Sequence, residues 1–246
     1  MRGVVDFHVH QPAAAAYGPK EYLAAMDELG FDVSVVFTYE GLLRPSAAAN
    51  DSLAAWVAPA PQRLIAFATV DPRDPGAGDE LERCVRDQGM RGLKLHSWLQ
   101  GFSAHHPGLQ RVCETAGRLG VPVLFHDGTP PFSTPLQLAT LARRHPETQI
   151  VLGHGGLHDL WREAVQAVLT TDNVHLCMSG TPGYAMRAIV ASCPLERLLF
   201  GTDGGLRPYP LPRYAVLRVR QLDELGLDDA QREAILVTNP RRLLAA

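Results

Sequence analysis

Short apolar runs recur along the chain, and segments in which apolar residues follow a helical spacing separate them. The runs are nearly continuous in apolar residues, which is typical of parallel strands covered on both faces. The predicted strands span residues 3–10, 32–39, 64–71, 92–96, 121–126, 149–154, 174–179 and 198–203. The predicted helices span residues 20–29, 50–58, 79–88, 107–119, 134–145, 158–169, 183–191, 212–225 and 229–236. This alternation over 246 residues predicts one α/β domain, a (β/α)8 TIM barrel over residues 1–246.

Composition and charge exclude several classes of protein. Apolar residues make up 46% of the chain, which is enough for a large core, and no apolar run is long enough to predict a membrane span. The net charge of −3 provides no basic surface for nucleic acid. The first predicted strand leaves no room for a signal peptide, and the cysteines show no C-x-x-C pairing. We therefore expect a cytoplasmic protein whose partner is a small molecule.

Side chains that can bind metals or move protons gather at the carboxyl ends of the predicted strands. In a TIM barrel these ends meet at one mouth, where the reactive residues lie. The residues at these positions are His8, His10, Lys94, His96, His126, His154, Ser179 and Asp203. His145 and His175 lie elsewhere, and we interpret them as structural. A group of imidazoles with a carboxylate at one mouth indicates an ion or a substrate.

The spacing and residue types at the mouth indicate a catalytic metal. His8 and His10 are two residues apart on a strand, so both imidazoles project to one side and can turn toward one ion. Imidazole and carboxylate ligands suit zinc, and also iron, manganese or nickel. Asp203 would accept the proton of the activated water, as well as or instead of binding the metal. His154 lies among glycines and could orient the nucleophile or protonate a leaving group.

These motifs together resemble those of the amidohydrolase superfamily. They are similar in particular to the compact amidohydrolase-related branch that includes aminocarboxymuconate-semialdehyde decarboxylase. The resemblance spans residues 3–243 and rests on His8-x-His10, Gly92-Leu-Lys-Leu-His96, Leu124-Phe-His126, Gly153-His154-Gly155-Gly156, Phe200-Gly201-Thr202-Asp203 and Asn239-Pro-Arg-Arg-Leu243. It implies that one divalent metal is bound by His8, His10, His126 and Asp203, and that His154 is catalytic. In dinuclear relatives the residue matching His154 binds a second metal, and members of this branch often form homodimers.

Lys94 is one of only two lysines in a chain that otherwise uses arginine, and it lies on a predicted buried strand. This choice indicates chemistry that arginine cannot provide. Lys94 could be carbamylated and bridge two metals, could pair with a substrate carboxylate, or could form a buried ion pair with Asp203 or Asp71. A two-metal site would need Lys94, His126 and His154 as ligands, and we expect one metal rather than two.

Aromatic and basic residues in the loops after the strands give an indication of the substrate. Trp98 and Arg207 lie in these loops, and together with Lys94 and His96 they are the predicted substrate-binding residues. Aromatic side chains with arginines form an apolar pocket that also holds an anion. A small aromatic or unsaturated carboxylate would fit such a pocket, but the aromatic side chains could equally pack the loops together.

Two reactions would use the same ligands. The first is hydrolysis of a C–N or C–O bond by metal-bound hydroxide, which we expect. The alternative is nonoxidative decarboxylation of an unsaturated or aromatic acid, and the fold cannot separate the two. Asp127-Gly-Thr-Pro follows His126 where the related decarboxylases tend to have His-Pro, which favours hydrolysis. A barrel that only binds a small molecule would have an incomplete ligand set, whereas the set here is complete.

Overall fold

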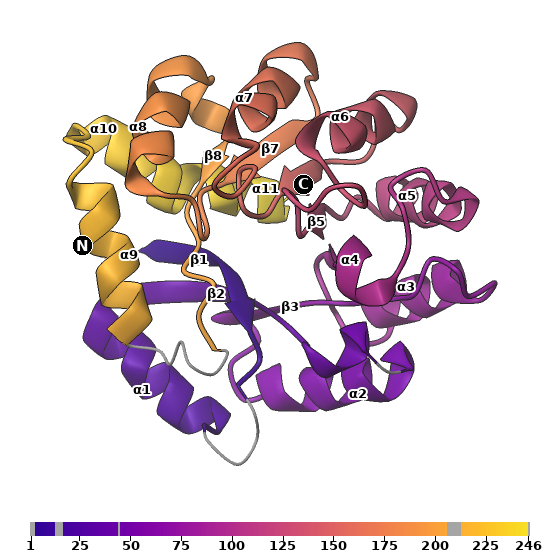
Figure 1. Cartoon of the computed structure of the whole chain (residues 1–246). Helices are drawn as coiled ribbons and strands as arrows, with labels where there is room; N and C mark the ends of the chain where they lie inside the picture. The colour runs from indigo at the N-terminus through magenta and orange to yellow at the C-terminus, as the bar shows by residue number, and fades with distance from the viewer. Residues whose placement is uncertain (1–2, 13–16, 44, 206–212, 246) are drawn as a thin grey trace.

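The computed structural model describes residues 3–12, 17–43, 45–205 and 213–245, in which parallel strands alternate with helices (Figure 1). The strands are β1 (Val4–His10), β2 (Phe31–Phe37), β3 (Leu64–Phe67), β4 (Leu93–Leu95), β5 (Val123–Phe125), β6 (Ile150–Leu152), β7 (Val174–Cys177) and β8 (Leu198–Leu199). The helices that follow them are α1 (Pro19–Leu29), α2 (Ser46–Val57), α3 (Ala77–Arg86), α5 (Pro107–Leu119), α6 (Pro135–Arg144), α7 (Trp161–Thr170), α8 (Gly183–Ser192) and α9 (Arg213–Asp223). Shorter elements are η1 (Glu40–Leu42), α4 (Ser97–Gln100), η2 (Leu195–Arg197), α10 (Asp229–Glu233), the π-helical η3 (Ala234–Thr238) and α11 (Asn239–Ala245).

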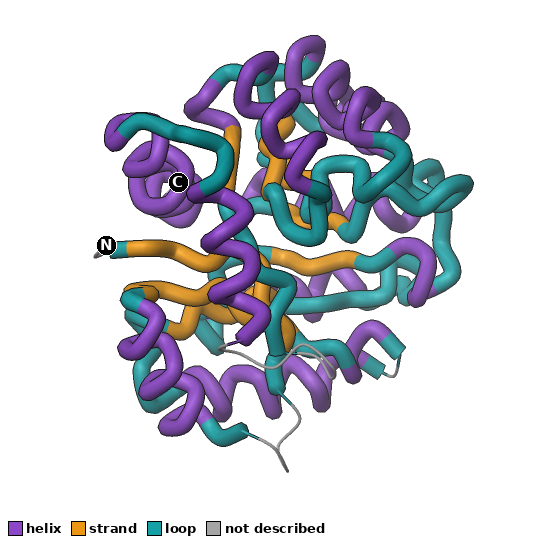
Figure 2. The backbone as a smooth tube through the Cα atoms, turned by 60° about the vertical axis from the view of Figure 1, so that its left-hand side comes forward, coloured by secondary structure: helices purple, strands orange, loops and turns teal. Residues whose placement is uncertain are grey.

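The strands form two parallel sheets, β1-β2-β3 and β4-β5-β6-β7-β8, that join at both edges. Between β3 and β4, the Lys94 N–H donates to the main-chain oxygen of Ala68 over 2.7 Å. Between β8 and β1, the Phe7 N–H donates to the main-chain oxygen of Phe200 over 3.0 Å. These contacts close the sheets into a barrel, and Figure 2 shows helices arranged around its strands. The predicted TIM barrel is confirmed.

The core has two parts, as the alternation of side chains along a strand requires. One part lies between the strands and the surrounding helices. The other fills the barrel interior and includes Phe7, Phe37 and Phe67. Leu243 and Leu244 of α11 belong to this inner group, so the last helix covers the end of the barrel opposite the mouth.

The strands are shorter than the apolar runs predicted, and this affects the site. β3 ends at Phe67 and β8 at Leu199, four residues before the predicted strand ends at 71 and 203. Beyond Leu199 the main chain still bonds to β1 at Phe200 and Asp203, but the Thr202 N–H between them donates to the Asp6 side chain over 2.9 Å, which interrupts the regular ladder. The sequence pattern did not predict α4 either, in which the side chain of His96 accepts from the Leu99 N–H at the first turn.

Candidate metal centre

His8 is fully buried on β1, and its ring is oriented by a main-chain carbonyl. Its Nδ1 lies 3.1 Å from the oxygen of Gly153. A carbonyl only accepts, so Nδ1 carries the proton and Nε2 presents a lone pair. This Nε2 lies 3.3 Å from Asp203 Oδ1 and 3.2 Å from Lys94 Nζ.

Two glycines make room for His8. A Cβ on Gly153 would lie 2.4 Å from the Phe125 oxygen and 2.9 Å from His8 Cε1. A Cβ on Gly201 would lie 2.6 Å from His8 Cβ. All three distances are shorter than the contacts that real Cβ atoms make, so these positions favour glycine. The glycines of the two motifs therefore shape the pocket for a histidine from another strand.

Asp203 follows β8 in an uncommon backbone conformation. Its φ is +60°, a left-handed value that a residue with a Cβ adopts at a cost. The Asp203 N–H donates to the His8 oxygen over 2.9 Å, and Oδ1 lies 3.3 Å from the Nε2 atoms of both His8 and His10. Burial raises the pKa of Asp203, but contact with His10 and the positive charges around it prevail and lower this pKa to about 2. The carboxylate is therefore ionised at neutral pH.

Asp6 supports this arrangement and was missed at the sequence level. Its carboxylate accepts from the Thr202 hydroxyl over 2.6 Å and from the His8 N–H over 3.2 Å. It thereby ties β1 to the segment that carries Asp203. Burial raises the pKa of Asp6 to about 7, despite the hydrogen bonds from Thr202 that lower it. The alternation Asp6-x-His8-x-His10 was the available signal, because these three residues share one side of the strand.

His154 lies just after β6 and is held by two loops. Its Nδ1 lies 3.0 Å from the Ser179 oxygen, so this nitrogen carries the proton. Its N–H donates to Asp127 Oδ1 over 2.6 Å, and the second oxygen of Asp127 accepts from the Gly156 N–H. The His154 Nε2 is buried and has no hydrogen-bond partner among the described residues. Asp127 is a second residue whose role the sequence did not reveal.

Lys94 is fully buried, and its ammonium group lies against the site. Its Nζ lies 3.2 Å from His8 Nε2 and 4.7 Å from the centre of the Phe37 ring. Burial lowers the pKa of Lys94 to about 8, although the charge of Asp203 opposes the shift. Asp71, one of the two ion-pair partners considered for Lys94, instead pairs with Arg73 over 2.6 Å.

The other imidazoles form a stack beside this group. The His96 ring lies parallel to the His126 ring at 3.7 Å between centres, and His126 lies 4.2 Å from His154. The centre of the Trp98 ring lies 6.1 Å from that of His96, and Trp98 is 56% exposed, so it lies at the rim of the site. Burial is the largest cause that lowers the pKa of each of these histidines, to about 4 for His154. Neutral imidazoles offer the lone pairs that metals need. Arg207 lies outside the described residues.

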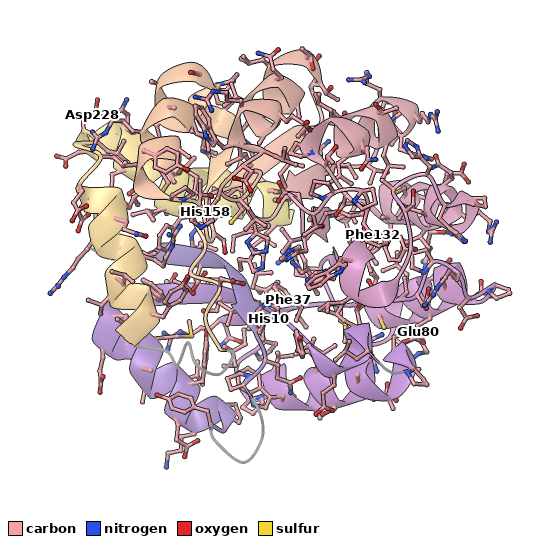
Figure 3. All side chains as sticks on the ribbon, in the orientation of Figure 1. His10, Phe37, Glu80, Phe132, His158 and Asp228 are labelled. Atoms are coloured by element: carbon pink, nitrogen blue, oxygen red, sulfur yellow. The ribbon has the colours of Figure 1, made fainter. Side chains whose placement is uncertain are left out.

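The metal-ligating atoms of three residues come together. In the part of the chain that the structure describes, the ligand atoms of His8, His154 and Asp203 all lie within 4.8 Å of one another. Two of them belong to the predicted ligand set, and the third is the predicted catalytic histidine. His10 approaches the same carboxylate oxygen, and Figure 3 shows it beside Phe37, whose ring centre lies 4.7 Å from its own. The buried, unpartnered Nε2 of His154 and the ionised Asp203 fit a divalent cation.

A cavity of about 730 Å³ lies near the mouth but does not include these residues. Its walls come from the segments after β2, β3 and β4, and include Asp71, Arg73 and Gln100. Gln100 connects it to the site, because its Oε1 accepts from the His96 N–H over 2.8 Å.

None of the described helices is long and apolar enough to cross a membrane.

Comparisons with known proteins agree with this fold. The structure of 2,6-dihydroxybenzoate decarboxylase from Rhizobium superposes with a TM-score of 0.76 at 20% identity, covering 100% of this chain and 99% of that one. The 5-carboxyvanillate decarboxylase from Sphingomonas paucimobilis gives 0.75 at 16% identity, covering 100% and 99%. A protein from Acinetobacter baumannii, described as a probable 2-pyrone-4,6-dicarboxylic acid hydrolase, gives 0.74 at 17% identity, covering 99% and 100%. At these identities the likeness shows the fold. The family model described as amidohydrolase matches residues 5–245, and the chain therefore belongs to the amidohydrolase 2 family of the amidohydrolase superfamily.

Proposed function

We propose that this chain is a metal-dependent hydrolase that cleaves a C–N or C–O bond of a small carboxylated substrate. One observation carries the proposal. His8 and His154 come from different strands, and a main-chain carbonyl fixes the proton of each on Nδ1. Both Nε2 lone pairs then lie close to the ionised carboxylate of Asp203. Orientation of ligand histidines by such second contacts is typical of metal sites.

A divalent metal, when bound, lowers the pKa of a coordinated water and polarises a carbonyl oxygen. Asp203 accepts the proton of the attacking water, since it is ionised and lies within the cluster. Lys94 contributes a positive charge beside His8, where it can hold a substrate carboxylate or the developing oxyanion. Zinc is the metal we propose first, with manganese, iron or nickel as alternatives.

The role of His154 has two versions, each supported by a different observation. The family resemblance makes His8, His10, His126 and Asp203 the ligands and leaves His154 free for catalysis. In that version its Nε2 takes up the proton that Asp203 removes from water and passes it to the leaving group. The geometry makes His154 itself a ligand beside His8 and Asp203. Both versions use the Nε2 lone pair of His154, and they differ in the metal content expected of a His154 variant.

The substrate we propose is flat and carries a carboxylate. The parallel rings of His96 and His126, with Trp98 at the rim, offer surfaces for a planar group. Proteins of similar fold are described as acting on 2,6-dihydroxybenzoate or 2-pyrone-4,6-dicarboxylic acid, which are planar carboxylated rings. Two of the similar structures are decarboxylases, so decarboxylation of such an acid is the second candidate reaction. Release of CO₂ across a panel of these acids, against hydrolysis of their esters, amides and lactones, separates the two.

Metal content per chain tests the proposal directly. We expect one equivalent in the wild type, and loss of metal in His8→Ala and Asp203→Ala. His175→Ala is the matched control, because His175 is a histidine on β7 away from the cluster. An unchanged equivalent in His154→Ala would make His154 catalytic, and loss of metal would make it a ligand. Two equivalents in the wild type would indicate a pair bridged by carbamylated Lys94. Absence of bound metal in the wild type after reconstitution would overturn the proposal.

The subunit number is a separate proposal. We propose a homodimer, on the family resemblance alone, and light scattering of the purified protein tests it.

A further inference from the structure

Arg218 of α9 is a buried cation that binds two main-chain oxygens. Its side chain is 3% exposed. Its guanidinium donates to the oxygens of Met178 and Thr181, and to the side chain of Gln221. None of the ion pairs formed within the described ranges includes Arg218. Because burial of a charge is costly, these contacts must be well placed for the side chain to remain there.

The two oxygens that Arg218 binds lie on either side of the segment that holds His154. The Ser179 oxygen accepts from His154 Nδ1 over 3.0 Å, and the Thr181 hydroxyl donates to the His154 oxygen over 2.8 Å. Gly180 lies against the ring, since a Cβ there would be 3.2 Å from His154 Nδ1. The position of this segment therefore decides where an acceptor for Nδ1 is found.

We propose that Arg218 is a positioning residue that keeps His154 in the Nδ1–H tautomer. By holding Met178 and Thr181, it fixes the Ser179 oxygen in front of Nδ1 and leaves the Nε2 lone pair free. That lone pair lies within 4.8 Å of the ligand atoms of His8 and Asp203. The inference rests on the proposed function in one respect only, which is that His154 Nε2 acts on the metal or the substrate.

The competing interpretation is that Arg218 only stabilises the fold. Arg197 provides the matched control, because its guanidinium also donates to two main-chain oxygens, those of Val168 and Thr171. Arg197 ends η2, immediately before β8 begins, so it lies at the end of the barrel opposite the mouth. Arg218→Met and Arg197→Met therefore both remove contacts with main-chain oxygens, at opposite ends of the barrel, and Arg197→Met also removes an ion pair with Asp172.

The experiment is ¹⁵N NMR of histidine side chains in the full-length protein, recorded with chelator and with Zn²⁺. His154→Asn identifies the signals of His154. In the chelated wild type and in Arg197→Met we expect one tautomer, protonated at Nδ1. In Arg218→Met we expect loss of this single tautomer, with signals from both protonated forms. Arg218→Lys keeps the charge but not the planar fork, so we expect partial recovery.

The outcomes decide whether Arg218 positions His154 or only stabilises the fold. An unchanged tautomer in Arg218→Met, with a melting temperature lowered as in Arg197→Met, would leave Arg218 a purely structural residue. If Arg218→Met does not fold, Arg218→Gln, which shortens the side chain and removes its charge, carries the same comparison, and a single Nδ1–H tautomer in it would overturn the proposal. Failure of the wild type to bind Zn²⁺ would contradict the proposed function, while the tautomers measured with chelator would still decide the role of Arg218.

Discussion

The two ends of the barrel use histidine in different ways. At the end opposite the mouth, His145 and His175 each contact a glutamine side chain, with Nε2 lying 2.8 Å from Gln110 Oε1 and 3.0 Å from Gln149 Oε1. At the mouth, His8 and His154 are instead oriented through Nδ1 by main-chain oxygens. In His145 and His175, Nε2 is thus hydrogen-bonded to a glutamine side chain. In His8 and His154, Nε2 is directed at the cluster of His8, His154 and Asp203.

A lowered pKa does not distinguish the two ends. Burial lowers the pKa of both His154 and His175 to about 4, since a charged imidazole loses its hydration in either place. The two histidines differ in what surrounds them. The centre of the His154 ring lies 4.6 Å from that of His8 and 4.2 Å from that of His126, and the carboxylate of Asp203 lies close by. Burial and a neutral ring alone therefore indicate a structural histidine. A metal site requires in addition that several side chains direct free lone pairs at one point.

The largest effect expected is that of Asp203→Asn. The amide cannot accept the proton of water, so we expect activity to fall by about 10²–10⁴-fold. Asp71→Asn is the control, since Asp71 follows β3 at the mouth but pairs with Arg73, and it should leave the rate unchanged. The measurement is the turnover of both variants on the substrate identified by the panel. A full rate in a metal-loaded Asp203→Asn variant would remove Asp203 from its role as base.

Lys94→Arg comes next, with an expected loss of about 10–100-fold in metal affinity or rate. The fully buried ammonium group fits between His8 and the Phe37 ring, and a guanidinium is wider and does not lose its proton. The exposed Lys20→Arg change on α1 should have no effect. Full activity in Lys94→Arg would exclude both carbamylation and a specific lysine contact.

The sequence predicted the barrel well because its signal is repetitive. Alternating apolar runs and helical segments recur along the chain, and glycines mark helix ends, such as Gly30 and Gly120 in the left-handed region at the ends of α1 and α5. The order of the strands then follows from the TIM barrel itself. The lengths of β3 and β8 were less predictable, because a local pattern does not show where side chains such as that of Asp6 take over the hydrogen bonds of the backbone.

The sequence predicts which residues form the candidate site better than it predicts which residues hold them in place. His8, His154 and Asp203 were identified from their positions at strand ends, and the structure brings them together. Asp6 and Asp127 were not given a role, because their function is to hold backbone N–H groups of distant segments, and no local pattern encodes this. Arg218 binds main-chain carbonyls, which every residue has, so no local pattern indicates its partners either.

A smaller effect is expected from Gly153→Ala. The added Cβ would lie 2.4 Å from the Phe125 oxygen, so the chain or His8 must move, and we expect a loss of about 1–3 kcal/mol in stability. Gly183→Ala is the control at the start of α8, where a Cβ would meet nothing within 4 Å. Thermal unfolding of the two variants measures the difference. Equal stability would show that the mouth tolerates a shift of His8.

The smallest effect concerns the opposite end, where His175→Gln should change only the pH dependence of stability. The pKa of His175 is lowered from 6.5 to about 4 in the folded protein, so between these values the unfolded chain binds one more proton. Stability therefore falls as the pH drops from 6.5 toward 4, by at most about 1.4 kcal/mol per pH unit for this group. Denaturant unfolding at several pH values should show a shallower decline in His175→Gln. Metal content should stay at the wild-type value in His175→Gln, because His175 does not belong to the cluster. A His175→Gln variant that lost its metal would show that the two ends of the barrel are coupled, and the distinction between structural and convergent histidines would then fail.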